Sequence, residues 1–417
     1  MTTWAISLFW IFLGLAIVQA AIAWRFVRAL KETPPRRVED SSCPKAAVVL
    51  CLRGPDPFLP ACLEAVLNLD YPHYDLHVVV DSRDDPAWAI AEQAIAAHGG
   101  RNVHMKPLTT RRATCSLKCS SLVQAISELD DSYKVLALLD ADTIPHRTWL
   151  RELAAPLAED RVAAATGNRW YVPGVASWGS LVRRLWNAAA VVQMFWFKIP
   201  WGGTLALKLD VVRRSNLLER WGNALCEDTM LYAALRPMGY RVAFVPSLMM
   251  INREGCDLES FFRWVRRQLL TARLYHPAWG LVVGHGLGTA VVQLAGIVAL
   301  VAAVLLRNWP AGVWLVAGAG SYWGVMVMLL AVLEDGVRHT AQPRGESIPT
   351  MRVSTVPRLL AAMALTQAVY PAALLSSILL RVVDWRGIRY RVEGPTKIRM
   401  IEYVPYGGEV RSESGSL

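Results

Sequence analysis

Charged residues are scarce in this chain of 417 residues. Asp, Glu, Lys and Arg make up 19% of the sequence, whereas 54% of it is hydrophobic. Soluble domains usually contain about 25% charged residues, so the chain is too apolar for a wholly soluble protein. Apolar runs long enough to cross a bilayer account for the excess.

Paired cysteines are also lacking. The seven cysteines are scattered, and Cys115 and Cys119 lack the histidines or second cysteine pair that would complete a zinc site. We therefore expect reduced, structural thiols in a cytoplasmic domain.

Acidic residues are outnumbered, and the net charge is +10. The basic residues gather beside hydrophobic segments, and the 17 tryptophans are typical of interfacial anchors. This pattern favours anionic lipid headgroups, and hence a membrane bilayer, over nucleic acid as the partner.

The first apolar segment runs from Trp4 to Trp24, contains no charge and has no obvious cleavage site after it. We expect residues 1–25 to be an uncleaved transmembrane anchor and residues 26–44 a linker. Because Arg25, Arg28 and Lys31 follow at once, the N-terminus is expected outside and the next domain on the cytoplasmic face of the inner (plasma) membrane.

Apolar segments at 281–306, 310–333 and 356–383 are each long enough to cross a membrane. Four full crossings would put the basic residues of 384–417 outside, against the positive-inside rule. Pro371 interrupts the last segment. For 281–383 we therefore expect two spans and a bent or re-entrant segment, followed by a basic cytoplasmic tail at 384–417. The spans contain almost no charge, which disfavours a transporter or channel.

Strand and helix patterns alternate between these membrane segments. Buried-strand runs at 46–52, 76–80 and 135–139 are separated by helical patterns, and strands at 161–171 and 241–246 follow. Residues 45–257 are therefore expected to form an α/β domain with a mostly parallel sheet covered on both faces. Helices at 177–198 and 258–276 are amphipathic and expected in the membrane interface, with an ordinary buried helix as the alternative for 177–198.

Two carboxylates follow the apolar run Val135–Leu139. Asp140 and Asp142 point to the same side of an extended chain, at a strand end, where ligands bind in α/β sheets. Such a pair suits Mg²⁺ or Mn²⁺ with space for phosphate oxygens. A helix cap is the alternative for an isolated D-A-D.

Further acids occur at other expected element ends. Asp81 follows the strand at 76–80, and Glu227 and Asp228 stand where a helix is expected to open. Acids in the first turn of a helix also suit its dipole, so simple capping is an alternative for this pair.

The ordered acids in V-V-V-D-S, L-L-D-A-D and C-E-D resemble those of membrane family 2 glycosyltransferases with a GT-A fold. Within that family the chain looks most like the ceramide glucosyltransferase-like branch. The stretches that support this are L-R-G-P-D-P at 52–57, D-S-R-D-D-P at 81–86, K-C-S-S-L at 118–122 and W-R-G-I-R-Y at 385–390.

The resemblance implies an inverting transferase that moves a sugar from a nucleotide-sugar, with UDP the favoured nucleotide, to a lipid acceptor such as a ceramide, hopanoid or glycerolipid. It implies a metal at Asp140 and Asp142, a general base at Asp228 supported by Glu227, and a nucleotide-sugar site that includes Arg53, Asp81, Lys118, Asp140 and Gly203.

One element departs from the family pattern. The family's Q/R-x-x-R-W element helps to hold the diphosphate, and Gln268 matches its first position, but Thr271 and Ala272 replace Arg-Trp. Diphosphate contact is therefore expected from Arg267 or Arg273.

Two alternative functions remain. A processive polysaccharide synthase should have an intact Q-x-x-R-W element and more membrane spans, and both are lacking. A non-catalytic membrane scaffold need not keep the acids, all of which are present.

Overall fold

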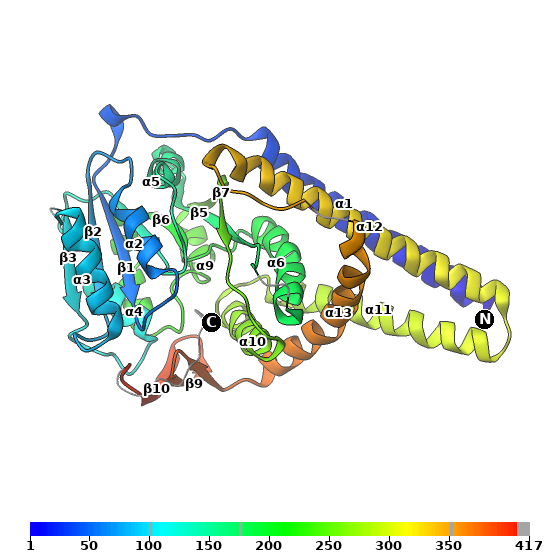
Figure 1. Cartoon of the computed structure of the whole chain (residues 1–417). Coiled ribbons are helices and arrows are strands. Elements are labelled where there is room, and N and C mark those ends of the chain that lie inside the picture. Colours follow the sequence, from blue (N-terminus) through cyan, green and yellow to red (C-terminus); the bar gives the residue numbers. More distant parts are fainter. Residues whose placement is uncertain (101, 175–176, 351–352, 407–417) are drawn as a thin grey trace.

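A computed structural model describes residues 1–100, 102–174, 177–350 and 353–406. Figure 1 shows an α/β domain from which three long helices project together, namely α1, α11 and α12. Two parts of the chain lie outside the described residues: Arg352, which precedes the last apolar segment, and residues 407–417 of the predicted tail.

The central sheet has the order β3-β2-β1-β4-β6-β5-β7. β6 runs antiparallel to both of its neighbours, and the other pairings are parallel. The predicted α/β class with a mostly parallel sheet is therefore confirmed. The strands are β1 (Ala46–Leu52), β2 (Tyr74–Val80), β3 (Val103–Pro107), β4 (Val135–Leu139), β5 (Val162–Tyr171), β6 (Thr204–Lys208) and β7 (Arg241–Asn252).

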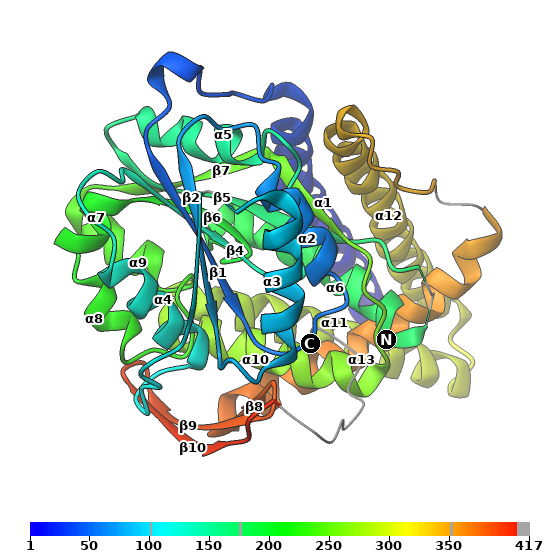
Figure 2. The same ribbon diagram turned by 60° about the vertical axis from the view of Figure 1, so that its left-hand side comes forward.

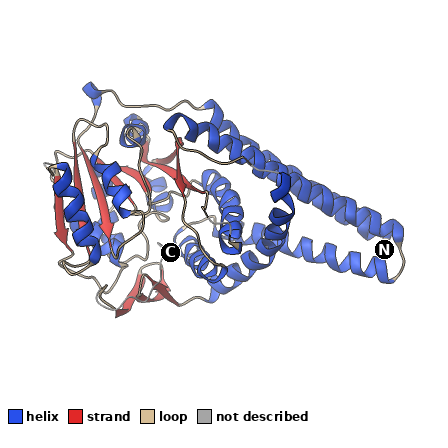
Figure 3. Cartoon of the chain, viewed as in Figure 1, coloured by secondary structure: helices blue, strands red, loops and turns tan. Residues whose placement is uncertain are grey.

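Helices cover both faces of this sheet, as Figures 2 and 3 show. One core packs the sheet against α2 (Leu59–Leu67), α3 (Pro86–His98) and α5 (Trp149–Ala154). The core on the other face lies under α4 (Leu117–Ser127), α7 (Leu209–Arg214), α8 (Leu217–Trp221) and α9 (Leu231–Leu235). Each side of β1 and β4 is buried, which explains their unbroken apolar runs.

Two strands differ from the sequence-based prediction. The edge strand β3 was not predicted, because an edge strand pairs on one side only and V-H-M-K-P lacks a buried apolar run. β7 continues six residues past Pro246, its predicted end, because the β5–β7 register shifts there, between the pairs Thr166–Phe244 and Asn168–Met249. Such an irregularity tolerates a proline within a sheet.

The first helix is longer than predicted. α1 spans Thr2–Glu32, so the helix continues seven residues beyond the predicted end of the membrane anchor at residue 25. The extra turns are held because Phe26 and Leu30 are buried in a cluster shared with α12, and because Arg28 pairs with Glu32 one turn later.

Four helices are long and apolar enough to cross a membrane: α1, α11 (Trp279–Leu305), α12 (Trp309–Ala341, continued to Arg344) and α13 (Val356–Leu379). α13 curves beside α6 and α10 instead of extending with the other three (Figure 1). Its first turns contribute Leu359 to a cluster with Trp170 of β5. At its other end, the Ser377 carbonyl accepts a hydrogen bond from Arg273 of α10.

The two predicted amphipathic helices are α6 (Trp178–Phe197) and α10 (Leu258–Tyr275). In an interfacial helix the basic residues face the lipid headgroups or solvent, but those of α6 point into the protein. Arg183 is fully buried and pairs with Glu254, and Arg184 pairs with Glu334 of α12. α6 therefore joins the segment after β7 of the central sheet to α12 through ion pairs.

The predicted tail begins with an ordered sheet that the sequence analysis did not foresee. β8 (Val382–Trp385), β9 (Ile388–Gly394) and β10 (Lys397–Tyr403) form an antiparallel sheet in the order β10-β9-β8. Ile388 and Tyr390 are buried in the core that contains α4, and Met400 N donates to the Ala113 carbonyl at 2.7 Å. The chain after α13 therefore returns to the α/β domain.

Candidate active site

A cavity opens at the carboxyl edge of the sheet, between the strand ends, α10 and the β8–β9 hairpin. Most of the predicted site residues line it. These are Arg53, Lys118, Asp140, Asp142, Glu227, Asp228, Arg267 and Gln268. Arg53, Asp140 and Asp142 follow the parallel strands β1 and β4, which end at this edge, whereas the others come from α4, from the loop between α8 and α9, and from α10.

Asp140 and Asp142 follow β4 directly. The chain turns there, with Thr143 N donating to the Asp140 carbonyl at 3.0 Å, and both carboxylates are half-buried at the cavity. The structure thus brings both acids to one cavity, but through a turn and not through the alternation of an extended chain on which the prediction rested.

Lys118 links this acid pair to a second one. Ser116 caps α4 by accepting from Cys119 N at 3.2 Å, which fixes the first turn of the helix. From that turn, Lys118 Nζ lies 2.5 Å from Asp140 Oδ1 and 2.6 Å from Glu227 Oε1. One ammonium group therefore holds carboxylates from two separate loops, the one after β4 and the one between α8 and α9.

The carboxylates of the cavity differ in their pKa. Burial alone would raise the pKa of Asp140, but the adjacent Lys118 ammonium group holds it below its usual value. Burial, and then the Asp140 charge, raise the pKa of Asp142 to about 6. Burial raises the pKa of Glu227 to about 7 despite Lys118. The cavity therefore favours additional positive charge near Asp142.

Asp228 is held by the turn before β6. Gly202 N donates to its Oδ2 atom at 2.8 Å, and Thr229 Oγ1 donates to Oδ1 at 2.8 Å. The helix predicted to open at Glu227 begins only at Leu231, so the capping alternative is wrong for Asp228.

The glycine turn fits closely around this group. A Cβ atom on Gly202 would meet the Glu227 carboxylate, and one on Gly203 would meet the Trp201 ring. Gly203 does not line the cavity, although Trp201 does. Close packing beneath the site therefore explains why position 203 requires glycine.

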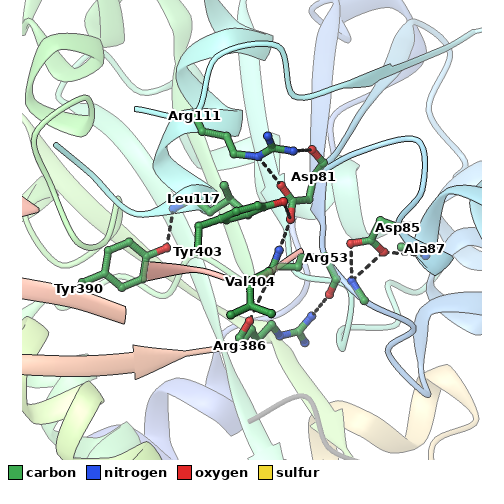
Figure 4. A network of polar contacts seen from close by, with 11 residues as sticks. Arg53, Asp81, Asp85, Ala87, Arg111, Leu117, Arg386, Tyr390, Tyr403 and Val404 are labelled. Atoms are coloured by element: carbon green, nitrogen blue, oxygen red, sulfur yellow. Dashed lines mark hydrogen bonds and ion pairs between the residues drawn. The ribbon is translucent and has the colours of Figure 1, made fainter. Parts of the chain in front are cut away.

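Asp81 also lies off the cavity, in the network that Figure 4 shows. Its buried carboxylate pairs with Arg53, accepts from Arg111 Nε at 3.0 Å and accepts from the Tyr403 hydroxyl at 2.9 Å. The carboxylate that was predicted to contact the nucleotide is thus hydrogen-bonded to Tyr403 of the C-terminal sheet.

α10 presents one face to the cavity. Trp264, Arg267, Gln268 and Thr271 line it, at the spacing of successive helical turns. Arg273 does not, which corrects its predicted diphosphate contact. Its guanidinium donates to the Ser377 carbonyl at 2.7 Å and to the Leu380 carbonyl at 3.0 Å, at the C-terminal end of α13.

Arg169 of β5 lines the cavity and was missed as a site residue. Its guanidinium lies 5.1 Å from the centre of the Trp201 ring and 4.9 Å from that of Trp264. Within the described residues it has no ion pair. The available signal was an arginine inside a strand whose other residues are almost all buried.

Arg267 is held in a similar way, with its guanidinium 4.5 Å from the centre of the Trp385 ring. Burial, and then the nearby charges of Arg386 and Arg169, lower its pKa to about 10. Neither a hydrogen bond nor an ion pair joins Arg267 to another described residue. The cavity thus contains two guanidinium groups fixed by aromatic rings, an arrangement suited to an anion.

The residues fit a divalent cation that is shared with a ligand. Asp142 faces the cavity without an ion pair to any described residue, although burial opposes its charge. No group of three or more His, Cys, Asp or Glu side chains in the described ranges could hold a metal ion by itself. A cation here would be held by Asp140 and Asp142 and by oxygens of the bound molecule.

These features define an α/β domain with an acid- and arginine-lined cavity, joined to apolar helices. The chain belongs to glycosyl transferase family 21, whose model matches residues 8–398. It is 24% identical over 284 residues to the probable glycosyltransferase YdaM of Bacillus subtilis (strain 168). That match covers 64% of this chain, and the chain spans only 64% of the length of that relative.

Solved structures with a similar arrangement include the mannosyltransferase PcManGT from Pyrobaculum calidifontis in complex with GDP-Man and Mn²⁺. The two chains are 19% identical with a TM-score of 0.49, and the match covers 91% of this chain and 97% of that one. S. aureus TarS 1–349 in complex with UDP-GlcNAc has 13% identity and a TM-score of 0.37, with 86% and 99% covered.

We predict that Asp142→Asn weakens Mn²⁺ binding in the presence of UDP by at least about tenfold, because it removes a charged ligand from the cavity. Electron paramagnetic resonance of free Mn²⁺ measures this. Asp84→Asn, which neutralises an exposed acid of the same domain, is the matched control. Equal Mn²⁺ affinity in the two variants would contradict the assignment of Asp142.

Proposed function

We propose that this protein is an inverting glycosyltransferase that moves a sugar from a nucleotide diphosphate-sugar to a membrane lipid. One observation supports this most strongly: a single cavity combines an acid pair, ring-held arginines and a fixed carboxylate, and it lies beside helices that can enter a membrane. The family to which the chain belongs agrees with transfer of a sugar.

The donor half of the reaction concerns the leaving group. When the bond between the anomeric carbon and the diphosphate oxygen breaks, negative charge grows on the diphosphate. Arg169 and Arg267 are already fixed at the cavity, so they stabilise that charge without first reorganising. A divalent metal held by Asp140 and Asp142 would add further positive charge there.

The acceptor half requires a base. A lipid hydroxyl is a weak nucleophile until a carboxylate takes its proton. Asp228 lines the cavity, and the Gly202 amide and Thr229 fix its orientation. The acceptor oxygen bonds to the anomeric carbon while its proton passes to Asp228, and one such displacement inverts the anomeric centre.

The lipid acceptor is proposed to approach along α10 and α6. Trp264 on α10 lines the cavity, while Phe261 of the same helix is buried among residues of α6, α11 and α13. This cluster forms an apolar path between the membrane helices and the site. A soluble acceptor would not need such a connection.

We also propose that α13 enters the membrane without crossing it. Both of its ends contact the α/β domain, and the sheet that follows it packs on that domain. With three crossings the N-terminus lies outside, and the domain and residues 382–406 lie in the cytoplasm, in agreement with the positive-inside rule.

Cysteine labelling tests this topology. In intact cells, an impermeant maleimide is expected to label Thr3→Cys and to spare Thr396→Cys, both of which replace exposed residues. After permeabilisation both should react, which controls for accessibility, and the unsubstituted protein gives the background from native cysteines. Labelling of Thr396→Cys in intact cells would contradict the proposal.

Asp228→Asn tests the catalytic role. The amide preserves the size of the side chain but cannot take a proton, so lipid glycosylation should fall by roughly a hundred to ten thousandfold. UDP affinity, measured by calorimetry, should stay within about threefold of wild type, because a single substitution away from the phosphates changes little there. Glu219→Gln, at an exposed position, is the control.

If Asp228→Asn retains more than about a tenth of the wild-type transfer rate, Asp228 is not the base. Glu227 is then the next group to test, because it is the neighbouring carboxylate in the cavity.

A further inference from the structure

The β8–β9 hairpin reaches into the cavity from outside the α/β domain. Trp385 and Arg386 both line it, together with Asp140 and Arg267. The strands pair Trp385 with Ile388, so Arg386 and Gly387 form the two-residue turn. The tip of this hairpin is therefore part of the site wall.

The turn places an arginine where glycine or asparagine is usual. Arg386 has φ 50° and Gly387 has φ 72°, the left-handed conformation that such tight hairpin turns require. A long side chain in that conformation is disfavoured relative to glycine, because its Cβ atom comes too close to the backbone. The rest of the structure has to hold Arg386 there.

The loop after β1 does so. Arg386 Nη2 donates to Asp56 Oδ2 at 2.7 Å, and Arg386 Nη1 donates to the Arg53 carbonyl at 2.7 Å. In return, Arg53 Nε donates to the Arg386 carbonyl at 3.0 Å. Figure 4 shows this reciprocal contact beside Asp81. The guanidinium of Arg386 is thereby fixed at the wall of the cavity.

α10 has no cationic side chain at the position where the Q-x-x-R-W pattern has its arginine. Thr271 faces the cavity where the Q-x-x-R-W pattern has its arginine, and its hydroxyl donates to the Gln268 carbonyl at 2.8 Å. The short side chain leaves no cation at that turn of the helix. Trp385 and Arg386 bring an indole ring and a guanidinium to the same cavity.

We propose that the β8–β9 hairpin completes the diphosphate site, with Arg386 as a direct phosphate contact and Trp385 as the residue that positions Arg267. The hairpin thereby adds a Trp and an Arg to the cavity beside Trp264 and Arg267 of α10. This proposal rests on the proposed function, because it concerns the diphosphate of the same donor.

The test compares UDP with uridine, in the presence of Mn²⁺, on the full-length protein in nanodiscs. Arg386→Ala should weaken UDP binding by about 10- to 100-fold, as expected for a charge-assisted hydrogen bond to phosphate, and should leave uridine binding within about twofold. The ratio of the two affinities does not depend on how much of the variant is folded. GDP and guanosine are run in parallel in case the base differs.

Arg389→Ala is the matched control. It removes one positive charge from the same hairpin, but Arg389 is exposed and pairs with Glu402 on β10. Its UDP-to-uridine affinity ratio should equal that of wild type.

The positioning role of Trp385 needs its own measurement. Trp385→Ala should weaken UDP binding by about 3- to 30-fold through loss of the ring under Arg267, and Trp385→Phe should restore most of it. In an Arg267→Ala background, Trp385→Ala should have little further effect. Full additivity of the two substitutions would overturn this role.

The outcomes separate the two proposals. If wild type binds UDP or GDP but Arg386→Ala matches Arg389→Ala, the hairpin proposal fails and the proposed function stands. If wild type binds neither nucleotide more tightly than its nucleoside, the proposed function fails and the hairpin proposal fails with it.

Discussion

Acidic side chains gathered in one cavity repel one another, and the Lys118 ammonium group is the contact that makes their assembly possible. It lies within 2.6 Å of Asp140, in the loop after β4, and of Glu227, in the loop between α8 and α9. This contact leaves Asp142 and Asp228 available for other tasks. On the proposed mechanism, it also explains how a single edge of the sheet can present both a cation site and a proton acceptor.

The positively charged side chains of the cavity are held in place in a different way. Arg169 and Arg267 are held by aromatic rings, and Arg386 is held by a strained turn and the loop after β1. Guanidinium groups fixed in this way keep their charge directed at the cavity. Three parts of the chain that are distant in sequence, namely β5, α10 and the C-terminal sheet, therefore bring arginines to one cavity.

The parts of this design that the sequence allowed us to predict are local. The apolar run of β4 and the position of Asp140 and Asp142 directly after it depend on neighbouring residues, and so does the helical face that presents Arg267 and Gln268. Long-range contacts were not predictable. Nothing near Arg273 in sequence indicates that it binds the end of α13, and nothing in W-R-G-I-R-Y indicates that Tyr390 accepts a hydrogen bond from Leu117 N in α4. From the sequence we therefore predicted a tail without the sheet that β8, β9 and β10 form.

The central claim is that the cavity joins a sugar to a membrane lipid. Mass spectrometry of lipids from cells with the gene, without it, and with only the Asp228→Asn form tests this most directly. The account predicts a lipid that is heavier than its precursor by one sugar, present only with the intact gene, while the precursor accumulates in the other two strains. Identical lipid profiles in all three strains would contradict it.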